Sequence, residues 1–408
     1  MKCLFTTILT LFVFSLSATV HTVDNSNNSV AQFTDLQSAI DAASEGDTLM
    51  IKGSYIPYSP QGVFGSLDNF TQGIRLNKRL VLIGEGAIGH PNGPDFEDWR
   101  QKTFIPRIFF TTDNGASASG SVMIGVFAER IVMGDINTTA ELITDIELRD
   151  CQFESLRFGE EDDEVDGITF IRSNIFMSTF IYARLKNLVA KNCFVEISGD
   201  SRATAGTSEF VNCLIRPWPS GDRTVYGQDN DGNDLYEREW PIENIKISNS
   251  VILLFRSNPD IPERVILKAS NAEMRNNIVM GPFETQDLLE SGNVAPIISN
   301  MSIELDPFVK TPPTESSTFF ATSFNNPIRS LTSIGDYHLK SGSVGVANGT
   351  DGTDIGLYGG DTPWIDGPVW RYSNEPQIPT IQSLQLADKV VKPGEGLKVR
   401  VKATAKGN

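Results

Sequence analysis

The sequence predicts an all-β chain built as a parallel β-helix, which is a solenoid of stacked coils. Two observations carry this prediction: short apolar runs rich in β-branched and aromatic residues, and a polar pair that breaks them at intervals mostly between 19 and 27 residues. A third is a single amphipathic helix before the first run. No coil of this length can bury its own apolar side, so stacking must supply the core.

The polar pairs mark the expected turns between strands. Their first members are Asp150, Ser173, Asn192, Asn212, Asn249, Asn276 and Ser299. Asparagine suits such turns because it tolerates the left-handed backbone conformation. A leucine-rich repeat would need a pattern that is missing, and an antiparallel sandwich would need turn signals every 8 to 12 residues. These alternatives are therefore disfavoured.

Three cysteines should form a file through the solenoid, because Cys151, Cys193 and Cys213 each follow a turn residue directly. Asn174 is expected to fill this file between Cys151 and Cys193. We expect buried, reduced thiols, and a Cys193 to Cys213 disulfide is the alternative. No C-x-x-C or Cys/His spacing suggests zinc.

The first 20 residues read as a secretory signal peptide. An apolar run from Leu4 to Phe14 is followed by small residues around Ser15, Ser17 and Ala18. This run is shorter than the roughly 20 residues needed to span a bilayer, so no membrane span is expected. We therefore expect a secreted or cell-surface protein, and a monomer.

The charge balance excludes nucleic acid as a partner. The chain carries 34 Lys and Arg against 51 Asp and Glu, for a net charge of −17. No Lys/Arg-rich run offers an electrostatic grip on a phosphate backbone. A polyanionic polysaccharide would also be repelled unless a cation intervened.

The stretch "FTDLQSAIDAASEGDTLMIKGSY", residues 33–55, predicts a helix and then the first strand. Thr34 is the expected N-cap, with Gln37 completing a capping box. Phe33, Leu36 and Ile40 share one face, which can cover the end of the core and protect its open sheet edges.

"LQSAIDAASEGDTLMIKGSY" resembles the opening of the secreted right-handed β-helix proteins, the pectate-lyase-like superfamily. "DYHLKSGSVGVANGTDGTDIGLYGG", residues 336–360, is similar to the closing coil of exported bacterial members, with Ser343-Val344 where Ser-Pro is common. The resemblance implies a right-handed β-helix domain over residues 30–365. It selects no activity, because the superfamily includes lyases, hydrolases and proteins without known activity.

Residues 366–408 form a C-terminal extension that alternates as "LKVRVKA" near its end. We expect a short strand-forming tail, which either packs along the solenoid or serves as an export signal. Similar tails follow the closing coil in the exported relatives.

One long excursion between coils, residues 216–241, is the predicted carbohydrate contact. Residues 224–239 read as a hairpin turning at Asp231-Gly232. The expected substrate-binding residues of the whole excursion are Trp218, Tyr226, Tyr236 and Trp240. Aromatic faces stack on sugar rings, although these side chains could instead hold the hairpin against the solenoid wall.

Calcium is the expected cation, if one binds. Asp229, Asp231, Asn233 and Asp234 offer closely spaced oxygen ligands, but the EF-hand pattern is not met. A second acidic excursion, "GEEDDEVDG" at residues 159–167, could also bind a cation or be a solvated turn.

No complete catalytic motif is present. A lyase needs a group that neutralises the uronate and a Lys or Arg that abstracts the proton α to it. The basic candidates among the coils are Arg149, Arg157, Arg172, Arg184, Lys186, Lys191 and Arg216. The polygalacturonase-like motif set is absent, and paired-carboxylate hydrolysis selects no pair.

The expected function is contact with an extracellular polysaccharide, either as a non-catalytic binder or as a lyase-like enzyme, with glycoside hydrolysis as the other enzymatic possibility. The alternative is a structural or adhesive surface protein without carbohydrate chemistry.

Overall fold

The structure is a computed structural model of the full chain. It describes residues 18–27, 29–54, 56–59, 73–86, 103–113, 115–134, 141–158, 164–178, 185–198, 208–218, 224–228, 232, 234–253, 263–270, 272–280, 283–285, 288–291, 338–339, 341, 343, 345–364, 380–386 and 399–404. At some strand positions only the backbone is described.

Two long sheets dominate the fold, and every strand pair within them is parallel. The 12-stranded sheet contains, in spatial order, β1 (Val20–Val23), β2 (Thr48–Ile51), β4 (Val81–Gly84), β8 (Val122–Ile124), β10 (Leu142–Arg149), β12 (Glu164–Ile171), β15 (Val189–Lys191), β17 (Ser208–Val211), β21 (Ile245–Ser248), β24 (Ala272–Arg275) and β27 (Leu288–Ser291), with β14 (Leu185–Lys186) also paired to β12.

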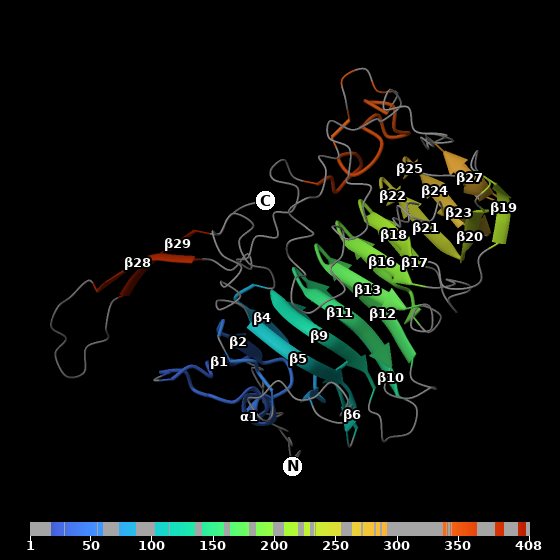
Figure 1. Ribbon diagram of the computed structural model, residues 1–408. Helices are drawn as coiled ribbons and strands as arrows, with labels where there is room; N and C mark the ends of the chain where they lie inside the picture. The colour runs from blue at the N-terminus through green and yellow to red at the C-terminus, as the bar shows by residue number, and fades with distance from the viewer. Residues whose placement is uncertain are drawn as a thin grey trace, which may run out of the picture.

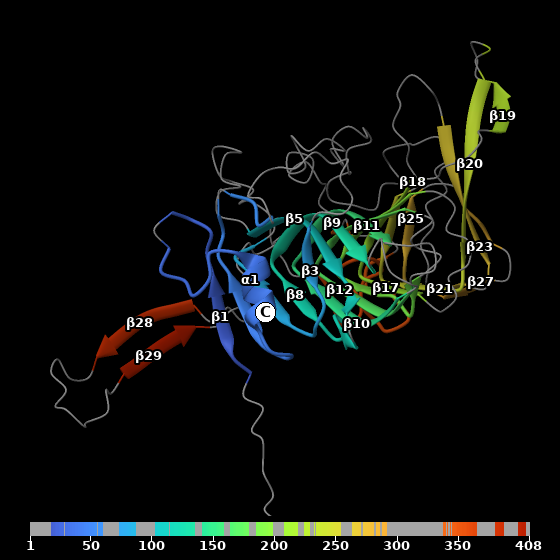
Figure 2. The ribbon, with the colours of Figure 1, turned by 90° about the horizontal axis from the view of Figure 1, so that it is seen from below.

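The 9-stranded sheet contains β3 (Ile74–Leu76), β5 (Thr103–Phe110), β9 (Val126–Met133), β11 (Gln152–Phe158), β13 (Asn174–Ser178), β16 (Phe194–Ser198), β18 (Leu214–Trp218), β22 (Val251–Leu253) and β25 (Ile278–Met280). From β8 to β18 the chain passes regularly from one long sheet to the other. The sheets form two layers along one axis (Figures 1 and 2). This arrangement is consistent with a parallel β-solenoid, and the all-β prediction is confirmed.

The core lies between the two layers and consists of aliphatic and aromatic side chains stacked coil on coil. Phe110, Phe153, Phe170 and Phe210 are among its buried members. In the described part of the chain, no helix is long and apolar enough to cross a membrane.

Left-handed residues form the corner between the two long sheets. Asp150, Asn192, Asn212, Asn249 and Asn276 have φ angles between 50° and 55°. In the first four, the backbone N–H donates to a carbonyl of the next coil. In the last, Asn276, the backbone carbonyl accepts from the N–H of Gly356. The turn prediction is therefore confirmed at these five positions, whereas Ser299 lies outside the described residues.

In the coil that follows Asp150 the prediction was wrong by one residue. Arg172, with φ 45°, takes the left-handed position instead of Ser173. Its side chain explains the choice: Nε and Nη2 donate to the two carboxylate oxygens of Asp150, both at 2.7 Å. This bidentate bond raises the pKa of Arg172 and supplies the contact that an asparagine amide makes elsewhere in the file.

A second left-handed file crosses the strands of the 12-stranded sheet. Asp145, Gly167 and Asn187 occupy equivalent register positions in β10, β12 and the β14–β15 junction, with φ angles of 56°, 78° and 51°. A Cβ added at Gly167 would lie 2.9 Å from Asp145 Oδ1. A side chain at position 167 would therefore have to displace that of Asp145, whereas glycine fits.

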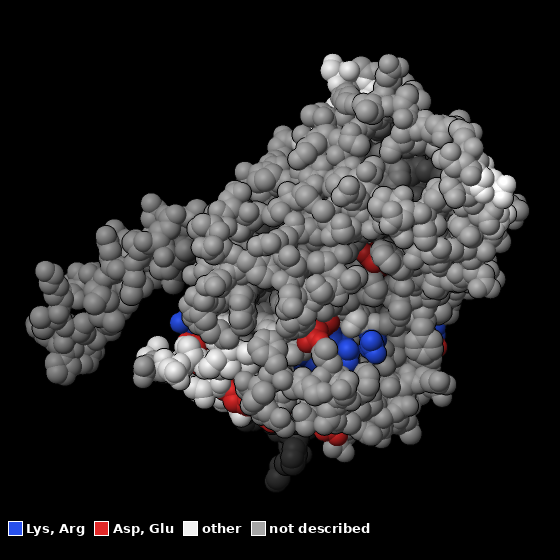
Figure 3. All heavy atoms as spheres, viewed as in Figure 1, with Lys and Arg blue, Asp and Glu red and all other residues white. Residues whose placement is uncertain are grey.

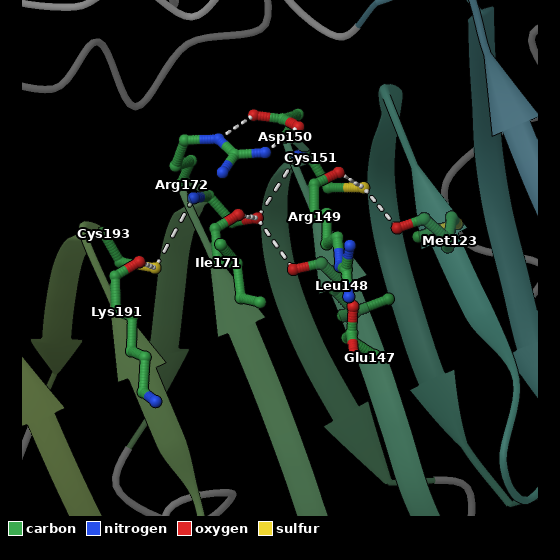
Figure 4. A network of polar contacts seen from close by, with 11 residues as sticks. Met123, Glu147, Leu148, Arg149, Asp150, Cys151, Ile171, Arg172, Lys191 and Cys193 are labelled. Carbon is green, nitrogen blue, oxygen red and sulfur yellow. Dashed lines mark hydrogen bonds and ion pairs between the residues drawn. The ribbon is translucent and has the colours of Figure 1, made fainter. Parts of the chain in front are cut away.

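An inner file of small polar side chains runs beside the first corner. Its members are Cys151, Ser173, Cys193, Cys213, Ser250 and Asn277, all buried. The N–H of Cys151 donates to Ser173 Oγ at 3.2 Å, and that of Ser173 to Cys193 Sγ at 3.4 Å (Figure 4). The pattern continues from Cys213 to Ser250 and from Ser250 to Asn277. In each of these four steps the later coil supplies the acceptor for the coil before it.

The three cysteines are free and buried, as predicted, so the disulfide alternative is excluded. Burial raises the pKa of the Cys151 thiol to about 12 and that of Cys193 well above its ordinary value. The protonated thiol of Cys151 donates to carbonyl oxygens, among them Met123 O at 3.4 Å (Figure 4). Asn174 was wrongly predicted in this file: it pairs with Gln152 and Phe194, and Ser173 takes the place between the cysteines.

The helix α1 (Leu36–Ala42) lies at the N-terminal end of the layers (Figure 2). Its N-cap is Asp35, whose carboxylate accepts from Ser38 N at 2.7 Å, and not the predicted Thr34. Gln37 does not complete a capping box. Its amide instead bonds both backbone groups of Arg75 in β3, the edge strand of the 9-stranded sheet. Leu36 and Ile40 are buried in the core as expected.

The described part of the predicted closing coil lies against earlier coils. Residues 345–364 form turns and bends that lie along the asparagine corners. Asn212 Nδ2 donates to Leu357 O and Gly359 O at 2.9 and 2.7 Å, and Asn276 Oδ1 accepts from Thr350 N. A Cβ at Gly356 would lie 2.8 Å from Ile278 Cδ1. This segment therefore spans several coils instead of adding one.

The remaining strands form three small sheets. The predicted hairpin is present as β19 (Thr224–Gln228) and β20 (Asp234–Glu243), and β20 continues in parallel to β23 (Glu263–Ser270) and β26 (Phe283–Thr285). The predicted tail contains an antiparallel pair, β28 (Thr380–Leu386) and β29 (Val399–Thr404), in a sheet of its own. β6 (Thr112–Asp113) and β7 (Ala116–Ser117) form the third.

Asn212→Ala should lower the free energy of unfolding by about 2–4 kcal/mol, because alanine strains the left-handed corner and two buried carbonyls lose their donor. Urea denaturation gives this value. Asn212→Gly is the matched control: it keeps the backbone relaxed and should lose about 1 kcal/mol less. Equal losses in the two variants would show that the left-handed corner carries no cost.

Ser173→Ala should destabilise the chain by about 1–3 kcal/mol, because the buried N–H of Cys151 loses its acceptor. Ser173→Cys should lose less, since cysteine occupies the same file in neighbouring coils. Thermal unfolding of both variants measures the order. A cysteine variant no more stable than the alanine variant would contradict the role of the file.

Candidate functional site

The outer face of the 9-stranded sheet changes character at β5 and β9. Ile105 and Ile108 both belong to the core, as do Ala128 and Ile131, so two residues instead of one separate successive core positions. Those intervening residues are Pro106-Arg107 and Glu129-Arg130. Because of this local departure from strict alternation, charged residues occur at the same level in two neighbouring strands that are otherwise apolar.

Three arginines gather on this face. Arg107 and Arg130 are direct register partners in β5 and β9, and Arg130 is in turn opposite Ser155 of β11. Arg157 follows two residues later in β11. Arg107 is only 9% exposed, Arg130 is partly buried and Arg157 is exposed. Adjacent strands are about 4.8 Å apart, so the arginines form one cationic group with an open side at Arg157.

Glu129 is the carboxylate of this group and is 9% exposed. Burial raises its pKa, while the positive charges of Arg130 and Arg107 act in the opposite direction. Burial lowers the pKa of Arg107, which Glu129 opposes and the like charge of Arg157 reinforces. We call Arg107, Glu129, Arg130 and Arg157 the arginine cluster. Its charges interact through a partly desolvated region, where electrostatic interactions are stronger than in water.

Polar and aromatic side chains flank the arginine cluster on the same sheet. Phe104 and Phe127 stack with ring centroids 5.0 Å apart, and Gln152 continues their row in β11. Figure 3 faces this side of the molecule and shows blue and red atoms adjoining over the region of β9 and β11. Carboxylates and hydroxyls of a ligand could therefore meet guanidinium donors and a neighbouring carboxylate at one place.

The predicted aromatic site is placed only by its backbone. Trp218 ends β18, opposite Ser198, and is described without its side chain. Tyr226 lies in β19, and Tyr236 and Trp240 lie in β20 opposite Glu263 and Leu267 of β23. Their binding role stays a prediction.

Of the predicted calcium ligands, only Asp234 is described, and it begins β20. Asp229, Asp231 and Asn233 lie outside the described residues, as do residues 159–163 of the acidic excursion at 159–167. Within the described ranges, no group of three or more His, Cys, Asp and Glu side chains is arranged to hold a metal ion.

The basic candidates from the sequence separate in space. Arg149, Lys186 and Lys191 lie in strands of the other long sheet, where Arg149 pairs with Glu147 and Lys186 with Glu164. Arg172 is held by Asp150, the side chain of Arg216 is not described, and Arg184 lies outside the described residues. Only Arg157 joins the arginine cluster.

Arg107, Glu129 and Arg130 were missed by the sequence reasoning. The signal was present as charged residues interrupting three apolar strands at similar offsets, in "FIPRIFF", "VFAERIVM" and "QFESLRF". The register of β5, β9 and β11 was needed to align them.

No known family model, curated protein or solved structure matches this chain.

Glu129→Gln should make stability less dependent on pH. A free glutamate titrates near 4.3, and the folded pKa of Glu129 is raised, so the folded state binds more protons between these two values. The contribution of Glu129 to the free energy of unfolding is therefore greatest below the pKa that it has in the unfolded chain. This contribution is lost as the pH rises through the higher pKa of the folded state.

Urea denaturation between pH 3.5 and 7 measures this difference. Wild type should lose stability relative to Glu129→Gln as pH rises. Glu209→Gln removes an exposed carboxylate from the other long sheet and is the matched control. A relative gain of wild type with rising pH would show that the arginines outweigh burial.

Proposed function

We propose that this protein is an exported, monomeric, right-handed parallel β-helix of the pectate-lyase-like kind that binds a carboxylate-bearing extracellular polysaccharide. The regular passage between two parallel sheets supports the β-helix. The contact of Gln37 with the edge strand β3 supports a capping role for α1, since the Gln37 amide supplies hydrogen-bond partners to backbone groups at the edge of the sheet.

The arginine cluster is the observation that carries the proposed binding function. The chain has a net charge of −17, so a polyuronate would be repelled by the molecule as a whole. Three arginines on the outer face of one sheet create a local exception. Guanidinium groups bind carboxylates through paired, charge-assisted hydrogen bonds, and Arg157 presents the exposed member of the group.

Lyase-like cleavage of the bound polysaccharide is the second candidate function. It is favoured by the opposed shifts in the arginine cluster, where burial raises the pKa of Glu129 and lowers that of Arg107. Such pairs supply a proton donor and a base nearer to neutral pH. A carboxylate neutralised by Arg130 or Arg157 would make the neighbouring C–H more acidic, as elimination requires.

Affinity gel electrophoresis tests the binding function. Wild type should be retarded in gels containing alginate or polygalacturonate, and not in gels containing a neutral polysaccharide. Arg157→Ala should weaken retention about tenfold because a charge-assisted contact is lost. Arg149→Ala, which removes an exposed arginine from the other long sheet, is the matched control and should bind normally.

The same gels separate the alternatives. Retention lost in Trp218→Ala or Trp240→Ala but kept in Arg157→Ala would move the site to the hairpin, and loss in EDTA would indicate calcium. New ultraviolet absorbance from unsaturated uronates would identify a lyase. No retention and no absorbance across a broad polysaccharide panel would favour the structural or adhesive function.

A further inference from the structure

A nearly buried carboxylate lies at the N-terminal end of the 12-stranded sheet. Asp47 directly precedes β2 and is 5% exposed. Its Oδ1 accepts from the backbone N of Thr19 at 2.7 Å, and its Oδ2 accepts from Ser44 N at 2.8 Å. These contacts lower the pKa of Asp47, with the bond from Thr19 as the largest contribution. The carboxylate is thus built to be ionised.

In the described chain, the basic side chain beside Asp47 is a histidine, which is charged only when it is protonated. This partner is His21, whose Nε2 lies 3.2 Å from Oδ2 of Asp47. The nearby basic side chains are engaged elsewhere: Arg79 pairs with Glu45, and Lys78 Nζ donates to the carbonyls at the end of α1. A buried carboxylate is most stable beside a full positive charge.

Thr19 directly precedes β1. Its carbonyl accepts from Thr48 N at 2.9 Å, and Val20 opens β1 in register with Thr48. Ala18 is exposed and lies outside the strands of the described chain. Ala18, directly before Thr19, is small, as the A-x-A-like pattern of a signal-peptide cleavage site requires at its last position.

We propose that the leader is removed by hydrolysis of the peptide bond between Ala18 and Thr19, and that the new ammonium of Thr19 binds Asp47. Water adds across the C–N bond, so Ala18 leaves with a carboxylate and Thr19 keeps its nitrogen as an ammonium. The atom that already donates to Asp47 as an amide thereby gains a full charge and two further hydrogens. This inference rests on the proposed export, but not on polysaccharide binding.

Intact mass and N-terminal sequencing of protein secreted from the full chain test the cleavage point. The expected first residue is Thr19. A chain that begins at Ala18 or within β1, or that keeps its leader, would overturn the proposal. Retention in the alginate gel is measured on the same material, so a failure of processing and a failure of binding are told apart.

The reactivity of the new amine tests its contact with Asp47. A free α-amine has a pKa near 8, and pairing with a carboxylate should leave about tenfold less of the reactive neutral form at pH 7. A slow acylating reagent should therefore modify Thr19 about tenfold more slowly in wild type than in Asp47→Asn. Glu45→Gln, two residues away and exposed, is the matched control and should react as wild type does.

A second comparison keeps Asp47 intact. A mature chain with one extra alanine before Thr19 displaces the ammonium and should be acylated as fast as Asp47→Asn. It should also unfold at a lower temperature than the chain that begins at Thr19. Equal acylation rates for the chain that begins at Thr19 and the chain with the extra alanine would overturn the proposed contact.

Discussion

The left-handed corner between the two long sheets is the constraint on which the structure depends. Each coil must reverse its path within two residues while its backbone still bonds to the coils on either side. A positive φ at the first of these residues achieves this, as at Asn192 and Asn212. The second residue then faces inward, which fixes the position of the buried polar file and places the next strand on the opposite sheet. Register throughout the core follows from this geometry.

The corner also explains how the C-terminal segment is used. The asparagine side chains also bond on the outer side of the corner: Asn212 Nδ2 donates to carbonyls of residues 357 and 359, and Asn276 Oδ1 accepts from the N–H of Thr350. A sequence that resembles a closing coil therefore becomes a strap across several coils. Its glycines are required by contact, since a Cβ at Gly360 would lie 2.1 Å from Asn249 Nδ2.

The repeat, the left-handed asparagines and the cysteine file could be predicted because each is a local pattern with a spacing. The turn after β12 was assigned to Ser173 instead of Arg172, because an arginine looks unlike a turn residue until Asp150 is placed beside it. The N-cap was missed by one residue, since threonine and aspartate stand together at positions 34 and 35. The arginine cluster was beyond reach because Arg107 and Arg130 are 23 residues apart and meet only through strand register.

The inner polar file has a consequence for how the molecule is made. Cys151 donates its N–H to Ser173, and Ser173 donates its own to Cys193, so each of these two coils offers a donor whose acceptor comes from the following coil. A chain emerging from the ribosome delivers the coils in that order. At these coils the growing end therefore carries one N–H whose acceptor the next coil brings. Such a chain can be assembled by vectorial addition, with each completed coil templating its successor.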